Sequence, residues 1–156
     1  MEKFEYVSAK SGMQSVNEHL TILAHNFATV TGKRLFITAN ILNRSDVKLT
    51  NQQGRKSPLL INFEYTDIDS VEMNIPAGYI AESTPKDILL DTKFGKYNAS
   101  FSVLPGKIKY VRKMERYSGL YPAADAVAFQ DFYKEVYRAD RLRIILVKKD
   151  IDSALN

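Results

Sequence analysis

The chain has 156 residues, and 22 Lys and Arg against 18 Asp and Glu give a formal net charge of 22 − 18 = +4 at pH 7. This length fits one domain with a hydrophobic core, and 45% apolar with 26% charged residues is an ordinary globular balance. The absence of cysteine excludes a catalytic cysteine, a thiolate metal site and a disulfide within the chain.

At the N-terminus, "MEKFEYVSAKSG" lacks the apolar core of a signal peptide, and no apolar run reaches the ~20 residues of a membrane span. The first predicted hairpin joins residues 19–30 to residues 33–42, with Thr31-Gly32-Lys33 as its turn. Both alternating sets of side chains in 33–42 are largely apolar, which is typical of an interior strand.

Residues 43–58 form the longest predicted loop, which ends in "GRKSP" directly before a strand. Arg55 and Lys56 place two cations next to Pro58. Two interpretations stay open, namely a docking point for a partner or a polar loop that merely precedes a strand. We take Arg55, Lys56 and the later Tyr121 as candidate docking residues.

The next two strands are predicted at residues 58–67 and 69–76. In the first, Leu59, Ile61, Phe63 and Tyr65 share one face. In the second, apolar residues at 71, 73 and 75 alternate with polar ones at 70, 72 and 74, the pattern of a strand with one wet side. Pro76 ends it.

Two hairpins are predicted in the β-rich segment 87–117. Phe94-Gly95-Lys96 and Pro105-Gly106-Lys107 each separate two alternating runs, as hairpin loops do. After Gly106, an apolar face is interrupted by Arg112.

One helix is predicted at residues 122–139, because Pro122 suits the first helical position and apolar residues recur at helical spacing. The stripe consists of Phe129, Phe132, Tyr133 and Val136. From Leu142 the period changes to that of an apolar strand. The sequence thus predicts a mostly β fold, an antiparallel β-sandwich of roughly seven to nine strands with the helix at about 122–139 packed on it. We expect a single domain over residues 1–156 with a polar tail at 150–156.

No catalytic, metal-binding or cofactor-binding residue stands out. His19 and His25 are the only histidines and lie too far apart along an extended chain for one metal. There is no Gly-x-Ser-x-Gly elbow, and the seven glycines form no phosphate-binding loop. The 18 acidic residues leave paired carboxylates open, but none is singled out.

A nucleic-acid surface is a further hypothesis, which we do not favour. Five cations near residues 107–116 are interleaved with tyrosines, as on a stacking platform. A solvated strand face explains the same pattern, and the net charge is only +4.

In order and spacing, the segments "KRLFITANILN", "GRKSPLLINFEYTD", "VEMNIPAGYIAESTPKDILL", "GKYNASFSVLPGKIKYVRKMERYSGLYPA" and "FQDFYKEVYRADRLRIILVKK" resemble the C-terminal β-domain of bacterial transglutaminase-like proteins. The resemblance covers about residues 33–149. In that family the Cys-His-Asp chemistry belongs to a separate central domain. The resemblance implies an accessory domain without the catalytic core, in an exported, periplasmic parent protein, and it transfers no functional residue to this chain.

We therefore expect a non-catalytic accessory or interaction domain whose partner is an adjacent transglutaminase-like domain or another protein. The alternative is a free-standing module that binds a glycan, a peptide or an envelope protein. We expect no cofactor, no nucleic acid and no membrane span.

Overall fold

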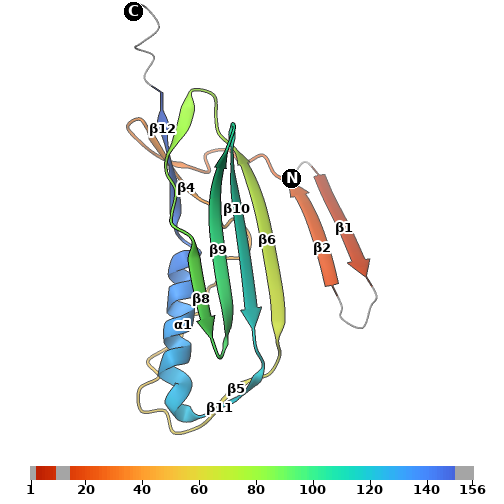
Figure 1. Ribbon diagram of the computed structural model, residues 1–156, viewed down its shortest axis with the longest axis vertical. Coiled ribbons are helices and arrows are strands. Elements are labelled where there is room, and N and C mark those ends of the chain that lie inside the picture. The colour runs from red at the N-terminus through yellow and green to blue at the C-terminus, as the bar shows by residue number, and fades with distance from the viewer. Residues whose placement is uncertain (1–2, 10–14, 150–156) are drawn as a thin grey trace, which may run out of the picture.

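The computed structural model describes residues 3–9 and 15–149 (Figure 1). Its largest element is an antiparallel sheet in the order β6-β10-β9-β8, which we call the large sheet. Its strands are β6 (Tyr65–Asn74), β10 (Lys107–Arg116), β9 (Gly95–Leu104) and β8 (Ile88–Thr92). The predicted tail at 150–156 lies outside the described residues.

A second antiparallel sheet, the short sheet, has the order β3-β4-β12-β7. It consists of β3 (Thr29–Thr31), β4 (Arg34–Thr38), β12 (Arg143–Lys148) and β7 (Tyr79–Ser83). The predicted turn around Gly32 joins β3 to β4, and β4 is an interior strand, as its two apolar faces indicated.

Two pairs of strands complete the β structure. The terminal ribbon consists of β5 (Leu59–Ile61) and β11 (Gly119–Tyr121), and the N-terminal hairpin of β1 (Lys3–Ala9) and β2 (Ser15–Thr21). The structure has more strands than the seven to nine predicted. Three-residue strands such as β3, β5 and β11 are too short for a period of two to reveal them.

Among residues 3–9 and 15–149, one α-helix is present, and it follows β11. A 3-10 turn (Ala123–Asp125) leads into α1 (Ala126–Ala139), which matches the predicted range of 122–139. Its buried residues include the whole predicted stripe, namely Phe129, Phe132, Tyr133 and Val136. No described helix is long and apolar enough to cross a membrane.

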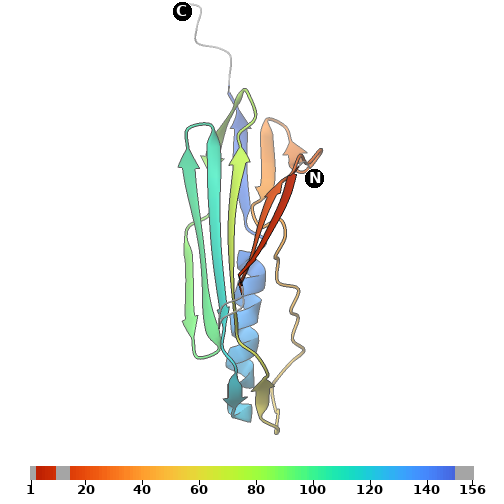
Figure 2. The same cartoon turned by 90° about the vertical axis from the view of Figure 1, so that its right-hand side faces the viewer.

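Figures 1 and 2 show how the helix fits into the two-layer arrangement. The large sheet forms one layer. The other layer contains α1 and β12, which follow one another along one face of the large sheet. The short sheet therefore covers one half of the large sheet, and α1 covers the other half. Residues 43–58 run beside α1 toward the terminal ribbon, and along the way Gln130 Nε2 on α1 donates a hydrogen bond to the Leu49 carbonyl at 2.9 Å.

The core lies between these layers, and its patterns largely follow the predicted faces. On β6, the residues at 71 and 73 are half-buried while those at 70, 72 and 74 are exposed. On β10, Ile108, Tyr110 and Met114 are buried, and so is the interrupting Arg112. Both predicted hairpins are present, since Thr92 pairs with Gly95 and Leu104 with Lys107.

Three sequence predictions were wrong. The strand boundary predicted near residue 68 is absent, because β6 runs without a break from Tyr65 to Asn74. Residues 19–28 do not pair with 33–42, because β2 pairs in full with β1 and only Thr29–Thr31 reaches β4. Phe63 does not share the buried face of Ile61, since the strand breaks at residues 62–64 and Phe63 is 66% exposed. Arg116 holds this break by donating two hydrogen bonds to the Phe63 carbonyl.

Candidate functional site

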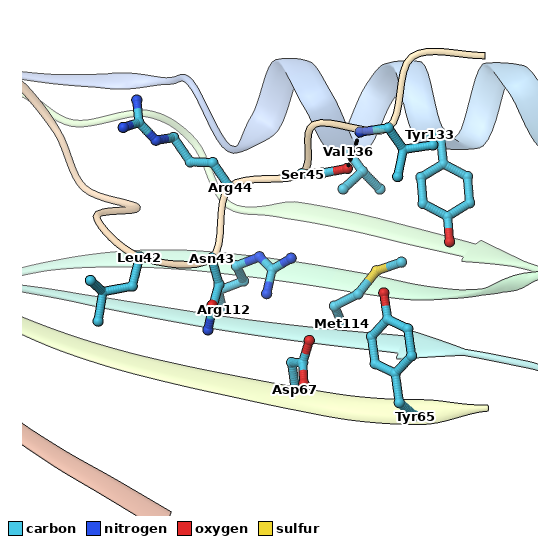
Figure 3. Close-up of a pocket in the computed structure, with 11 residues that line it drawn as sticks. Leu42, Asn43, Arg44, Ser45, Tyr65, Asp67, Arg112, Met114, Tyr133 and Val136 are labelled. Atoms are coloured by element: carbon cyan, nitrogen blue, oxygen red, sulfur yellow. Dashed lines mark hydrogen bonds between the residues drawn. The ribbon is translucent and has the colours of Figure 1, made fainter. Parts of the chain in front are cut away.

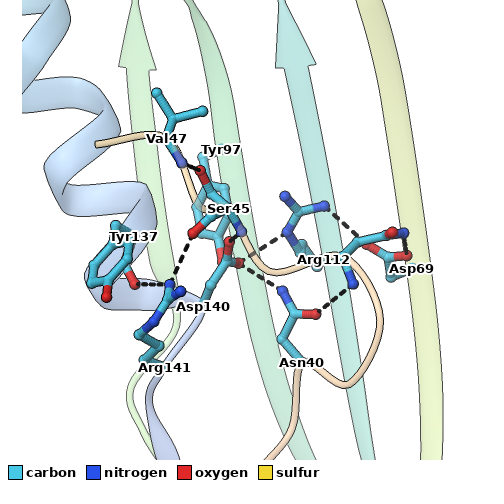
Figure 4. Close-up of polar contacts among 10 residues, drawn as sticks. Asn40, Ser45, Val47, Asp69, Tyr97, Arg112, Tyr137, Asp140 and Arg141 are labelled. Atoms are coloured by element: carbon cyan, nitrogen blue, oxygen red, sulfur yellow. Dashed lines mark hydrogen bonds and ion pairs between the residues drawn. The ribbon is translucent and has the colours of Figure 1, made fainter. Parts of the chain in front are cut away.

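The most buried charged group is Asp140, which directly follows α1 and is 1% exposed (Figure 4). Its Oδ1 accepts hydrogen bonds from Asn40 Nδ2 at 2.8 Å, Tyr97 Oη at 2.8 Å and Arg112 Nε at 3.0 Å. Its Oδ2 accepts one from the Ser45 backbone N–H at 2.7 Å. With four donors, this carboxylate has the partners that a buried charge requires.

Arg112 joins Asp140 to a second carboxylate on the large sheet. Its Nη1 lies 2.9 Å from Asp69 Oδ2, and Asp69 is the cross-strand partner of Arg112 between β10 and β6. Burial alone would lower the pKa of Arg112, but Asp140 and Asp69 outweigh it and raise this pKa. Arg112 is therefore a permanently charged link between the sheet and the end of α1.

A second set of contacts, made by Arg141, holds loop residues 42–47 against the end of α1. The Arg141 guanidinium lies over the Tyr137 ring at 3.4 Å and donates to the Ser45 carbonyl at 2.9 Å. It also pairs with Asp46 at 2.8 Å. These contacts give the loop a fixed position, which shapes the neighbouring pocket.

A pocket of about 250 Å³ opens between this loop, α1 and the inner face of β6 and β10 (Figure 3). Its walls mix apolar, aromatic and charged side chains. The lining residues are Leu42, Asn43, Arg44, Ser45, Val47, Tyr65, Asp67, Arg112, Met114, Tyr133 and Val136.

The Asp67 carboxylate lines this pocket and has no hydrogen-bond or ion-pair partner among the described residues. Although the residue as a whole is exposed, its carboxyl group turns toward Met114 and Arg112 (Figure 3). Loss of water raises the pKa of Asp67; Arg112 partly opposes this, and Asp69 adds to it. The hydroxyls of Tyr65 and Tyr133 face the same space.

A second pocket of about 450 Å³ lies at the opposite end of the large sheet. The turn before β7 and the β9–β10 hairpin form its walls, which are mainly apolar. Lys149 is the charged residue in its lining. This pocket therefore offers shape without a set of convergent polar groups.

The three predicted docking residues all lie near the terminal ribbon, because Leu59 of β5 pairs with Tyr121 of β11. Arg55 folds back on its own loop and donates to the carbonyls of Ser57 and Pro58 and to Gln52 Oε1. Lys56 is exposed. Tyr121 is half-buried, packs on Phe94 with ring centroids 5.0 Å apart, and donates to the Lys93 carbonyl.

The same ribbon presents two leucines that the sequence did not single out. Leu60 and Leu120 are cross-strand partners and are 62% and 69% exposed. Their neighbours Leu59 and Tyr121 turn toward the core. The run "PLLI" gave no sign of which leucine would face outward, since both are apolar.

The remaining sequence candidates do not assemble into a site. His19 on β2 and His25 after it are both exposed. Tyr110 and Arg112 are buried, so they cannot form a stacking platform for bases. Within residues 3–9 and 15–149, no group of three His, Asp or Glu side chains could hold a metal ion.

Comparisons with known proteins give a family but no activity. A crystal structure of a putative protease from Parabacteroides distasonis superposes with a TM-score of 0.56 and 13% identity. At 13% identity this similarity shows the fold alone, and it covers 72% of this chain but only 23% of that chain. No curated protein matches the chain. A family model described as a domain of unknown function with a solved structure, DUF3858, matches residues 33–146. That span is more than half of the sequence, and the chain belongs to the DUF3858 family.

Proposed function

We propose that this chain is a non-catalytic accessory domain that docks beside a transglutaminase- or protease-like core through its terminal ribbon. The observation that carries this proposal is the outward-facing pair of Leu60 and Leu120, which are 62% and 69% exposed on directly opposed positions. Adjacent exposed apolar side chains with polar residues around them are typical of protein–protein contact surfaces.

The surroundings of this pair also suit a protein partner. Arg55 makes no ion pair in the described structure, and neither does Lys56, so the ribbon is bordered by two uncompensated cations. Phe63 follows β5 by two residues and is 66% exposed, with the Arg116 guanidinium 4.9 Å from the centroid of its ring. An apolar surface with acidic residues around it complements this arrangement.

Two further observations support an accessory role. The fold also occurs within a much longer polypeptide, since the match covers 23% of the Parabacteroides chain. In the present chain, the buried polar groups around Asp140 bind one another and fix the loop against the helix. Buried polar networks of this kind make a fold rigid and specify one packing arrangement, which suits a structural role for these residues.

The proposed lack of catalytic activity is tested with the purified chain. We expect no peptidase, amidase or acyl-transfer turnover above that of buffer. Turnover that persists after His19→Ala and His25→Ala would overturn the proposal. The reading frame upstream of Met1 gives an independent test, because a cysteine-containing transglutaminase core favours the accessory role. A start codon at Met1 without such a core favours the free-standing binding module.

The docking part is tested in the parent polypeptide by limited proteolysis of the junction between this domain and the core. We expect Leu60→Lys with Leu120→Lys to accelerate cleavage without unfolding the domain. Leu89→Lys is the matched control, because Leu89 is 73% exposed on β8 in a different part of the surface. Equal cleavage of the two variants would contradict docking through the ribbon.

A further inference from the structure

The pocket beside Asp67 is large enough to admit one side chain. Its volume of about 250 Å³ lies just below the ~300–1,000 Å³ usual for small-molecule sites. It opens beside β6, which is an edge strand of the large sheet. A partner chain can therefore approach from the margin of the sheet and insert a single side chain.

The charged groups in and behind the pocket leave one carboxylate without a partner. Arg112 contributes one positive charge and already pairs with both Asp140 and Asp69. Asp67 adds a third carboxylate, and the Arg116 guanidinium lies at the margin of the pocket, 4.7 Å from the centroid of the Tyr65 ring, with no ion pair to Asp67 among the described residues. Arg44 also lines the pocket, but its side chain extends away from Asp67 (Figure 3). The unpartnered Asp67 carboxylate is thus an acceptor for a cation.

The walls suit an aliphatic stem that ends in such a cation. Val47, Met114 and Val136 provide apolar contact along the pocket, while the Tyr65 and Tyr133 hydroxyls can accept hydrogen bonds near Asp67. Lysine and arginine bury a methylene chain and present a charged end. We propose that this pocket binds one basic side chain, a lysine or an arginine, from a polypeptide partner.

The identity of the partner rests on the proposed interaction function, but the chemistry of the pocket does not. The test therefore uses free probes on the folded chain and follows backbone amide shifts by NMR. The probes are Nα-acetyl-L-lysine amide, Nα-acetyl-L-arginine amide and the uncharged Nα-acetyl-L-norleucine amide. We expect saturable shifts at Asn43, Ser45 and Asp67 for a basic probe, with a Kd on the order of 1 mM.

The variant Asp67→Asn keeps the shape of the side chain and removes its charge. It should weaken binding of the basic probe by roughly tenfold or more, because a charge-assisted hydrogen bond is lost. Asp131→Asn is the matched control, since Asp131 is exposed on α1 outside the pocket lining, and it should leave the affinity unchanged. Binding of only one basic probe would identify the partner side chain as lysine or arginine.

Three results would overturn the assignment: no saturable shift at the pocket up to about 20 mM of either basic probe, equal binding of the norleucine probe, or unchanged binding in Asp67→Asn. These failures would leave the accessory role standing. That role fails instead on enzymatic turnover or on equal proteolysis of the ribbon and control variants.

Discussion

Arg112 and Asp140 form a buried ion pair in which Arg112 Nε lies 3.0 Å from Asp140 Oδ1, with side-chain exposures of 4% and 0%. The pair connects the middle of β10 to the residue that ends α1. Removing two charges from water is costly, and the pair persists because further hydrogen bonds satisfy both groups. It therefore fixes where the helix and the following loop dock on the large sheet.

Arg112→Ala should strongly destabilise the protein, because it leaves Asp140 buried without its cation. Loss of one member of a buried pair costs about 3–5 kcal/mol. Urea denaturation measures this change, and Arg112→Met separates loss of charge from loss of volume. Lys109→Ala on the opposite face of β10 should change the free energy of unfolding by less than about 0.5 kcal/mol. If Arg112→Ala lowered the free energy of unfolding as little as Lys109→Ala does, the ion pair would not be needed for stability.

Tyr97 and Tyr110 should respond in opposite ways to loss of their hydroxyls. Tyr97 donates to Asp140 at 2.8 Å, whereas the Tyr110 hydroxyl is buried without a hydrogen-bond partner in the described structure. Tyr97→Phe should cost about 1–3 kcal/mol, and Tyr110→Phe should be neutral or stabilise by up to about 1 kcal/mol. Urea denaturation at pH 8 checks both. Destabilisation by Tyr110→Phe as large as that by Tyr97→Phe would show that its hydroxyl has a partner.

The same tyrosines make stability fall at alkaline pH. Burial raises the pKa of Tyr110 to about 12, against an ordinary value of 10.0; the Tyr97 hydroxyl moderates this shift, although it lies outside hydrogen-bonding geometry. Between pH 10 and 12 the unfolded tyrosine loses its proton while the folded one keeps it, so the free energy of unfolding decreases as the pH rises. Tyr110→Phe should therefore lose less stability than the wild type between pH 8 and pH 11. Parallel curves for the two proteins would contradict the raised pKa.

Patterns within single strands predicted the faces of the sheet but not the partners across it. The sequence showed that Arg112 interrupts an apolar face, and the structure buries it there. Its partner Asp140 could not be found, since it is separated by 28 residues and its position depends on how α1 docks. The pocket was missed for the same reason, because Asp67 and Tyr133 come to line one cavity only when the helix packs on the large sheet.

Asp67 should reduce stability at neutral pH, as groups retained for binding often do. Its pKa is raised, chiefly by loss of water, so its ionised form is disfavoured in the folded state. Asp67→Asn should increase the free energy of unfolding at pH 7 by about a few tenths of a kcal/mol, after allowance for solvent screening of a partly exposed group. The gain should shrink as the pH falls through the raised pKa of the folded state, and it should vanish below the ordinary pKa, where the carboxyl group is neutral in both states. Asp131→Asn should show no such pH dependence, and a loss of stability at pH 7 would contradict this prediction.

Phe132 is the most direct test of whether α1 stabilises the large sheet. Its side chain is 4% exposed and packs edge-on against Tyr133, with ring centroids 5.3 Å apart. Phe132→Ala removes a large apolar group and leaves a cavity between the helix and the sheet, which should cost roughly 3–5 kcal/mol. Alanine has the highest helix propensity, so the loss would report packing and not helix formation.

Lys134→Ala, on the exposed side of the same helix, should be nearly neutral. A loss below about 1 kcal/mol for Phe132→Ala in thermal or urea unfolding would mean that the aromatic stripe does not anchor the helix.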